Sequence, residues 1–183
     1  EKGGGGLVNR FAWLLDRLAY EPRRNAKIAL IADYLRTTPD PDRGYALAAM
    51  TGGLVFRNAK AGLIRALIAE RTDPVLFALS YDYVGDLSET VALLWPTPAA
   101  THDPSSNHAP LALSEVVDTL ASGGRINLPP ILVTWLDALD ETGRWALLKL
   151  MTGSLRVGVS ARLAKTAVAQ LGDVAPDDVE QVW

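Results

Sequence analysis

Apolar residues recur with the period of an α-helix along almost the whole chain, and this pattern constrains the fold more than any other feature. Phe11, Leu14, Leu15 and Leu18 are spaced i, i+3, i+4 and i+7, which places them on one face of a helix. We find no convincing alternation of apolar and polar residues, which would indicate a half-buried strand. The helical spacing recurs at Ile28, Ile31 and Leu35, at Leu132, Trp135, Leu136 and Leu139, and at Leu163, Ala167 and Leu171. The sequence therefore predicts an all-α fold.

One segment of the chain is echoed about a hundred residues later. Met50-Thr-Gly-Gly-Leu54 returns as Met151-Thr-Gly-Ser-Leu155, an offset of 101 residues (151 minus 50). At the same offset, Tyr34-Leu35 returns as Trp135-Leu136. Chance similarity between amphipathic helices is the alternative, but the echo favours a repeated unit of helix, turn and basic helix.

The echo divides the chain into two related halves, about residues 27–70 and 128–170. We expect their Met-Thr-Gly turns to face one side of the molecule. Both halves belong to a single all-helical domain over residues 7–183, with an irregular loop at 96–110 between them. Residues 1–6 have no targeting character and are expected to be a cloning remnant outside the fold.

The turn of the second half combines glycines, a capping serine and cations in a pattern that suits an anionic ligand. Gly153 allows the preceding helix to end in a left-handed conformation, and Gly158 frees the backbone before Ser160, a favourable N-cap. A helix start presents N–H groups at the positive end of the helix dipole, where a phosphate can bind. The predicted contacts of this turn are Gly153, Ser154, Arg156, Gly158, Ser160, Arg162 and Lys165.

Charge is segregated along the chain, although the formal net charge is only −3. Segments 43–71 and 141–172 each contain five basic residues and one acidic residue, and they overlap the two predicted halves. Segment 72–124 has seven acidic residues and no Lys or Arg. An anionic partner responds to this local sign rather than to the total. In the first half, the predicted contacts are Gly53, Arg57, Lys60 and Arg65.

A further helix start lies between the halves, in Gly85-Asp-Leu-Ser-Glu-Thr. Asp86 and Glu89 have the spacing of a capping box. A capped structural helix explains this segment well. As a candidate site, Gly85 and exposed hydroxyl groups of Ser88 and Thr90 would contact a phosphate.

The residue patterns of the familiar catalytic sites are missing. Cysteine is absent, which excludes disulfides and thiolate metal sites and is typical of a cytoplasmic protein. His102 and His108 fall in the predicted loop, where solvated turns are favoured over a metal site. Asp137, Asp140 and Glu141 are better explained by helix-end solvation than as paired catalytic carboxylates. No apolar run approaches the length of a membrane span, so we expect no membrane partner.

Two of these segments resemble motifs of a known family. Gly85-Asp-Leu-Ser-Glu-Thr-Val-Ala92 and Thr152-Gly-Ser-Leu-Arg-Val-Gly-Val-Ser160 resemble, in order, motifs of the N-terminal DNA-binding domain of ATP-dependent DNA ligases, with bacterial representatives closest. The resemblance spans essentially residues 9–183. Two positions depart from the family pattern: Val55-Phe-Arg-Asn-Ala-Lys60 replaces a second Leu-Gly-hydrophobic-Gly, and Ser88 replaces a glycine.

The resemblance implies a pseudo-symmetric helical domain that holds duplex DNA at a nick, through the minor groove and phosphates, in DNA repair or replication. It implies a monomer whose partners are duplex or nicked DNA and the adenylation and OB domains of the same ligase. The adenylation motif Lys-x-Asp-Gly is missing, since Lys60-Ala-Gly62 lacks the aspartate. We therefore expect no catalytic residue, metal or cofactor in this fragment, with ATP and Mg²⁺ needed only by a full-length ligase.

Two other functions remain as alternatives. A helical-repeat scaffold for protein interactions would have an apolar concave groove and no salt-sensitive affinity for DNA. A helical DNA-repair enzyme such as a glycosylase is suggested by the similarity of Leu155–Gly158 to a DNA-binding hairpin. That enzyme would need a catalytic aspartate or lysine in a base-sized pocket, which the sequence does not indicate.

Overall fold

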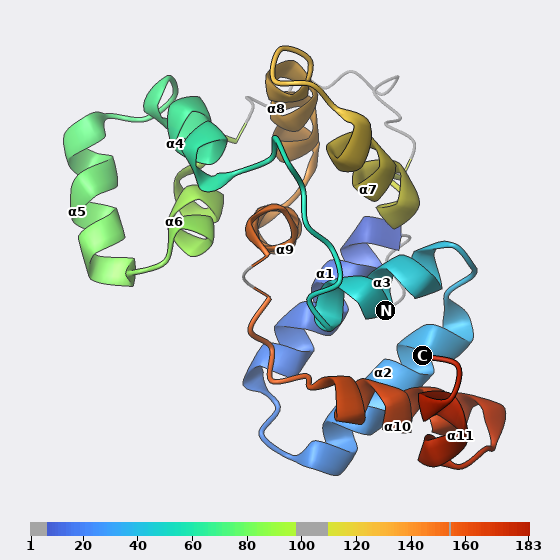
Figure 1. Cartoon of the computed structure of the whole chain (residues 1–183). Helices are drawn as coiled ribbons and strands as arrows, with labels where there is room; N and C mark the ends of the chain where they lie inside the picture. The colour runs from blue at the N-terminus through green and yellow to red at the C-terminus, as the bar shows by residue number, and fades with distance from the viewer. Residues whose placement is uncertain (1–6, 98–109, 154) are drawn as a thin grey trace.

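The computed structural model describes residues 7–97, 110–153 and 155–183, and in these ranges it consists of α-helices joined by turns, without a strand (Figure 1). The predicted all-α class is therefore confirmed. In the same ranges no helix is long and apolar enough to cross a membrane. The helices are α1 (Leu7–Tyr20), α2 (Arg24–Thr37), α3 (Asp42–Met50), α4 (Ala61–Ala69), α5 (Pro74–Val84), α6 (Leu87–Leu94), α7 (Leu113–Ser122), α8 (Leu128–Ala138), α9 (Glu141–Thr152), α10 (Ala161–Gly172) and α11 (Pro176–Glu180).

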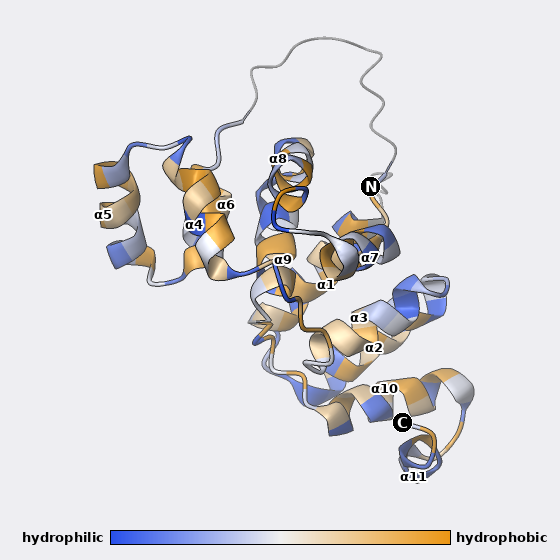
Figure 2. Cartoon of the chain, turned by 45° about the horizontal axis from the view of Figure 1, so that its top comes forward, coloured by the Kyte–Doolittle hydropathy of each residue, from blue (hydrophilic) through white to orange (hydrophobic). Residues whose placement is uncertain are grey.

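The predicted apolar stripes form the core. Phe11, Leu14, Leu15 and Leu18 of α1 are each at most 1% exposed. Full burial of such a side chain contributes about 1.5–3 kcal/mol, so this single face supplies much of the stability of the fold. Figure 2 shows hydrophobic stretches of α1 and α9 in the middle of the molecule and of α4 to one side of them, whereas the outer ends of α3 and α7 are hydrophilic.

Helices that are distant in the chain pack on one another in a reciprocal way. α1 packs on α9 and α3 on α7, while α2 packs on α10 and α4 on α8. Matching α1–α4 in order with α7–α10 relates these pairs to one another. The pair α1–α9 then corresponds to α7–α3, and the pair α2–α10 corresponds to α8–α4. Each set of four helices therefore completes its packing with helices of the other set.

The helices α4, α5 and α6 extend to one side of α9 (Figure 1). α6 packs firmly on α9, whereas α5 packs on α6 and has no buried residue. Asp73 caps the start of α5 by accepting hydrogen bonds from the backbone N–H groups of Val75 and Leu76. The outer face of α5 leaves Val75, Leu79 and Tyr83 exposed.

Parts of the predicted chain organisation lie outside the described residues. These are residues 1–6 and most of the predicted loop, including His102 and His108. At the two edges of that loop, Pro96, Thr97 and Pro110 are not helical.

Candidate nucleic-acid interface

The two Met-Thr-Gly turns have the same local structure. Gly52 after α3 and Gly153 after α9 are both left-handed, with φ of 78° and 67°. The hydroxyl of Thr51 donates to the carbonyl oxygen of Leu47 at 2.8 Å, and that of Thr152 donates to its counterpart Leu148 at 3.0 Å. The echo in the sequence therefore corresponds to a repeated backbone turn.

The left-handed position in the first turn is Gly52, the residue before the predicted DNA contact Gly53. Gly53 has no positive φ, and its backbone N–H donates to the carbonyl oxygen of Ala48 at 2.7 Å. At the offset of 101, Gly53 corresponds to Ser154, which lies outside the described residues.

The two turns lie against each other. A shallow cavity of about 240 Å³ is lined by Gly52, Leu54 and Lys60 from the first turn and by Thr152 and Gly153 from the second. In Figure 1 the connection from α3 leads up to α4 and the connection from α9 leads down to α10. The fold therefore brings together two segments that are a hundred residues apart.

Each turn is anchored by one apolar side chain at equivalent positions. Phe56 and Val157, which differ by the same offset of 101, are each 3% exposed. Beyond the anchor, the hydroxyl oxygen of Ser160 accepts a hydrogen bond from the backbone N–H of Leu163 at 3.1 Å, as predicted for an N-cap. Lys60 occupies the N-cap position of α4 and makes no such bond. The start of α10 is therefore the better-ordered helix terminus of the two.

Lys27 of α2 holds the second turn in place. Its ammonium group donates to the carbonyl oxygens of Val157 at 2.9 Å and Gly158 at 3.4 Å. Gly158 has φ of 68°, and a Cβ at this position would collide with the ammonium nitrogen. Glycine is therefore favoured here by the left-handed backbone conformation, whereas the flexible Lys27 side chain would only have to move aside.

The first turn of α2 adds cations that the sequence analysis missed. α2 packs along α10, so Arg24 lies at the same end of the molecule as Lys27 and the start of α10. Arg24 and Lys27 have helical i, i+3 spacing, which was visible in the sequence. Their proximity to the second turn was not visible in the sequence, because it depends on the packing of α2 on α10.

Four of the predicted cations are exposed near the two turns: Arg57, Lys60, Arg156 and Arg162. Among the described residues, no carboxylate lies within 4.0 Å of their charged groups. These side chains are positioned to attract an anion.

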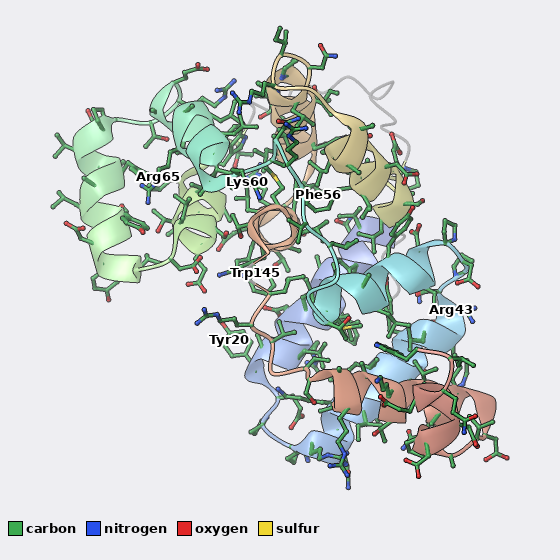
Figure 3. The ribbon with its side chains drawn as sticks, viewed as in Figure 1. Tyr20, Arg43, Phe56, Lys60, Arg65 and Trp145 are labelled. Carbon is green, nitrogen blue, oxygen red and sulfur yellow. The ribbon has the colours of Figure 1, made fainter. Side chains whose placement is uncertain are left out.

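Two other predicted cations are engaged elsewhere. The guanidinium of Arg65 lies 4.9 Å from the centre of the Tyr81 ring, on the side of α4 that faces α5 (Figure 3). The Lys165 side chain is 12% exposed, and its ammonium lies 2.7 Å from Glu180 Oε2 and 5.1 Å from the centre of the Trp183 ring. Lys165 therefore contributes less free positive charge than predicted, whereas Arg65 keeps its charge and is held against Tyr81.

The hydroxyls of the Gly85 segment are not available to a ligand. Ser88 is 3% and Thr90 0% exposed, and the Thr90 hydroxyl donates to the backbone oxygen of Asp86 at 2.7 Å. The expectation that these two hydroxyls are exposed is wrong, because both lie on buried positions of α6, the helix that packs on α9. Gly85 itself is exposed and left-handed, with φ of 76°.

Asp86 connects α6 to α9. Its carboxylate accepts the backbone N–H of Glu89 at 2.9 Å and forms an ion pair with the Lys149 ammonium at 2.5 Å. Burial raises the pKa of Asp86, but the hydrogen bonds from Lys149 and Glu89 outweigh this effect, so the pKa lies below its usual value. The capping-box aspartate therefore has a structural role.

The acidic residues before and at the start of α9 are also structural. Asp137 accepts a hydrogen bond from the Trp95 indole N–H at 2.8 Å, and Asp140 caps α9 by accepting the backbone N–H of Gly143 at 2.8 Å. Burial lowers the pKa of nearby Arg144, whose Nε donates to the Leu136 carbonyl oxygen at 2.6 Å. This arrangement agrees with capping and packing rather than with paired catalytic carboxylates.

No protein-family model matches the chain, and a search of curated proteins finds no significant match. Function is therefore inferred from the residues and the geometry of the two turns.

Proposed function

We propose that this chain is a non-catalytic DNA-binding domain of an ATP-dependent DNA ligase, and that it holds duplex DNA at a nick through phosphate and minor-groove contacts. The observation that carries the proposal is the meeting of the two Met-Thr-Gly turns at one cavity, with Lys60 beside it. Exposed cations of both halves adjoin these turns. A surface of this kind suits a polyanion that extends across both halves of the protein.

The reciprocal helix packing supports the pseudo-symmetric arrangement of the ligase type. The two strands of a DNA duplex are related by local two-fold axes, so two equivalent turns can approach the phosphates of opposite strands. Two-fold DNA-binding proteins use the same correspondence between protein and DNA symmetry. In this proposal, the turn at Gly52 and the turn at Gly153 each contact one strand.

The second turn supplies the stronger contact in this proposal. The start of α10 presents backbone N–H groups at the positive end of the helix dipole, and Arg156 and Arg162 add charge beside it. Lys27 keeps the turn in one conformation before DNA arrives, which reduces the ordering cost of binding. Contacts of this type position the duplex without reading its sequence.

Ligation itself belongs to other parts of the proposed parent enzyme. The adenylation and OB domains would bind ATP and Mg²⁺ and complete the enclosure of the DNA. The described residues are assigned only a role in holding the duplex.

The proposal is tested by measuring the affinity of the chain for a nicked duplex over a range of salt concentrations. Replacing Arg156 with alanine should weaken binding by about 1–2 kcal/mol, the contribution of a charge-assisted hydrogen bond. It should also lower the slope of log K against log salt by about one. The weakening should be the same for unrelated DNA sequences.

Arg36→Ala is the matched control. Arg36 is an exposed arginine at the other end of α2, where it pairs with Asp33 at 3.6 Å, so its loss should leave affinity almost unchanged. Equal binding by Arg156→Ala and the parent chain would remove the second turn from the site. Absence of any salt-sensitive DNA affinity would favour the alternative of a protein-interaction scaffold.

A further inference from the structure

A groove distinct from the two turns lies between α1, α6 and α9, with Val84 of α5 also in its lining. These three helices form a groove of about 480 Å³, because α1 and α6 both pack on α9 and leave a channel where they diverge. The apolar part of the lining includes Tyr20, Val84, Leu93 and Trp145. Tyr20 from α1 and Trp145 from α9 lie near each other in Figure 3.

The apolar lining is unusually accessible. Tyr20 is 83% exposed and Leu93 is 57% exposed, and both face the same groove. Tyr83, the residue before Val84 at the end of α5, is exposed as well. Grouped apolar side chains on a surface indicate an interaction site more often than single ones do.

Each of the three helices contributes one carboxylate to the groove. These are Asp16 of α1, Glu89 of α6 and Glu141 of α9. In the part of the chain that the structure describes, no Lys or Arg lines the groove, and no cationic group lies within 4.0 Å of these carboxylates. The groove therefore combines exposed apolar side chains with three carboxylates that form no ion pair within 4.0 Å, although the guanidinium of Arg144 is close enough to Glu141 to interact with it electrostatically.

This combination limits the possible occupants. DNA and anionic lipid would be repelled by three carboxylates. Among the described residues, no group of three acidic or histidine side chains is close enough to hold a metal ion. An uncharged peptide would cover the apolar residues but leave the carboxylates unpaired at its edge. A polypeptide segment with both apolar and cationic side chains satisfies both parts of the lining.

We propose that this groove docks a cationic amphipathic helix of a partner protein. The apolar stripe of that helix would cover Tyr20, Leu93 and Trp145, and lysines or arginines beside the stripe would pair with Asp16, Glu89 and Glu141. This inference does not depend on the proposed DNA-binding function. The groove is lined by Glu141 to Trp145 in the first turns of α9, and Gly153 follows the last turn, eight to twelve residues or about 12–18 Å further along the helix. Both surfaces can therefore be occupied at once.

The test uses the whole 183-residue chain and a fluorescein-labelled, fourteen-residue synthetic peptide as probe. The probe has leucine at i, i+3, i+4 and i+7 positions and lysine elsewhere, and its binding is followed by fluorescence anisotropy. We expect the parent chain to bind it. The variant Glu89→Gln/Glu141→Gln should bind about five- to tenfold more weakly at low salt, and Leu93→Ser should weaken binding by a similar factor.

A charge-matched control separates docking from general attraction. Glu115→Gln/Asp177→Asn removes two exposed carboxylates from α7 and α11, and it should change affinity by less than about twofold. Equal weakening by both double variants would overturn the proposal, as would equal binding of a probe with glutamate in place of lysine. Failure of the parent chain to bind the probe would overturn it as well. Sedimentation that shows a dimer dissociated by Glu89→Gln/Glu141→Gln would assign the groove to a second copy instead.

Discussion

The connection from α3 to α4 and the connection from α9 to α10 share a backbone plan but differ in their polar side chains. Both contain a left-handed glycine, a threonine bonded to the preceding helix and a buried apolar anchor. Only the second has a side-chain N-cap, and only the second is held by a lysine of another helix. The repeated features therefore determine the path of the chain, whereas in the proposed function the unshared ones determine how strongly each turn holds a phosphate.

The helices that precede the two turns, α3 and α9, also differ in their polar side chains. Lys149 of α9 corresponds, at the offset of 101, to Ala48 of α3. Lys149 is buried and pairs with Asp86, so α9 is tied to α6 by an ion pair that α3 cannot make. The second half is therefore tied to α6 by an ion pair, whereas α3 of the first half uses the buried carboxylate of Asp42 to accept the backbone N–H groups of Leu113 and Ser114. Loss of the ion pair should have a large effect on stability.

We expect Asp86→Ala to lower the free energy of unfolding by about 2–4 kcal/mol. The substitution leaves the Lys149 ammonium unpaired at 11% side-chain exposure and removes the N-cap of α6. Chemical denaturation measures the change. Removing the exposed pair of Arg36 and Asp33 by Asp33→Ala serves as the control and should cost about 0–1 kcal/mol.

The contribution of the Asp86 carboxylate to stability depends on pH. The pKa of Asp86 is lower in the folded chain than its usual value, so its ionised form stabilises the fold above the unfolded pKa of about 3.9. This contribution is lost as the pH falls through the lower folded pKa. The stability difference between the parent and Asp86→Asn should therefore shrink below about pH 4. A difference that stays constant down to pH 2 would show that the ion pair does not stabilise the fold.

The second expected effect concerns DNA and compares the two turns directly. Arg156→Ala/Arg162→Ala should reduce affinity for a nicked duplex by about 2 kcal/mol, and Arg57→Ala/Lys60→Ala by about 1 kcal/mol. The difference follows from the ordered start of α10, which fixes the geometry of the phosphate contact, whereas the start of α4 has no side-chain cap. Both values are obtained from titrations at one fixed, moderate salt concentration. Equal losses would indicate that the cap and the Lys27 brace do not influence binding.

The sequence was sufficient to predict the helices and most of their buried faces, because those depend on local spacing. The stripe from Phe11 to Leu18 and the caps at Asp86 and Ser160 are examples. Local spacing also predicted that a left-handed glycine ends α9. In the first turn, by contrast, two consecutive glycines left open which of them is left-handed, and the positive φ lies at Gly52. The contact of Gly53 with DNA stays a prediction.

The remaining features depend on tertiary packing, which spacing within one helix does not reveal. Ser88 and Thr90 follow a good helix start, but only the packing of α6 on α9 makes them buried. Lys165 follows Arg162 on one face of α10, but only the position of α11 gives its ammonium a carboxylate partner. Lys27 lies 130 residues from the carbonyl that it contacts.

The smallest expected effect tests whether the two turns are equivalent in backbone register. Gly52→Ala and Gly153→Ala each introduce a Cβ at positive φ into open space, so each should cost about 1 kcal/mol of stability through backbone strain alone. Gly53→Ala places its Cβ 3.4 Å from the Ala48 carbonyl oxygen without positive φ, so it should stay within about 0.5 kcal/mol of the parent. Thermal unfolding of the three variants gives the comparison. Neither left-handed glycine has a neighbour that an added methyl group would contact. Unequal losses of stability at Gly52 and Gly153 would therefore mean that the two turns differ in backbone conformation. The proposed contact of the two turns with the two DNA strands would then lose its structural basis.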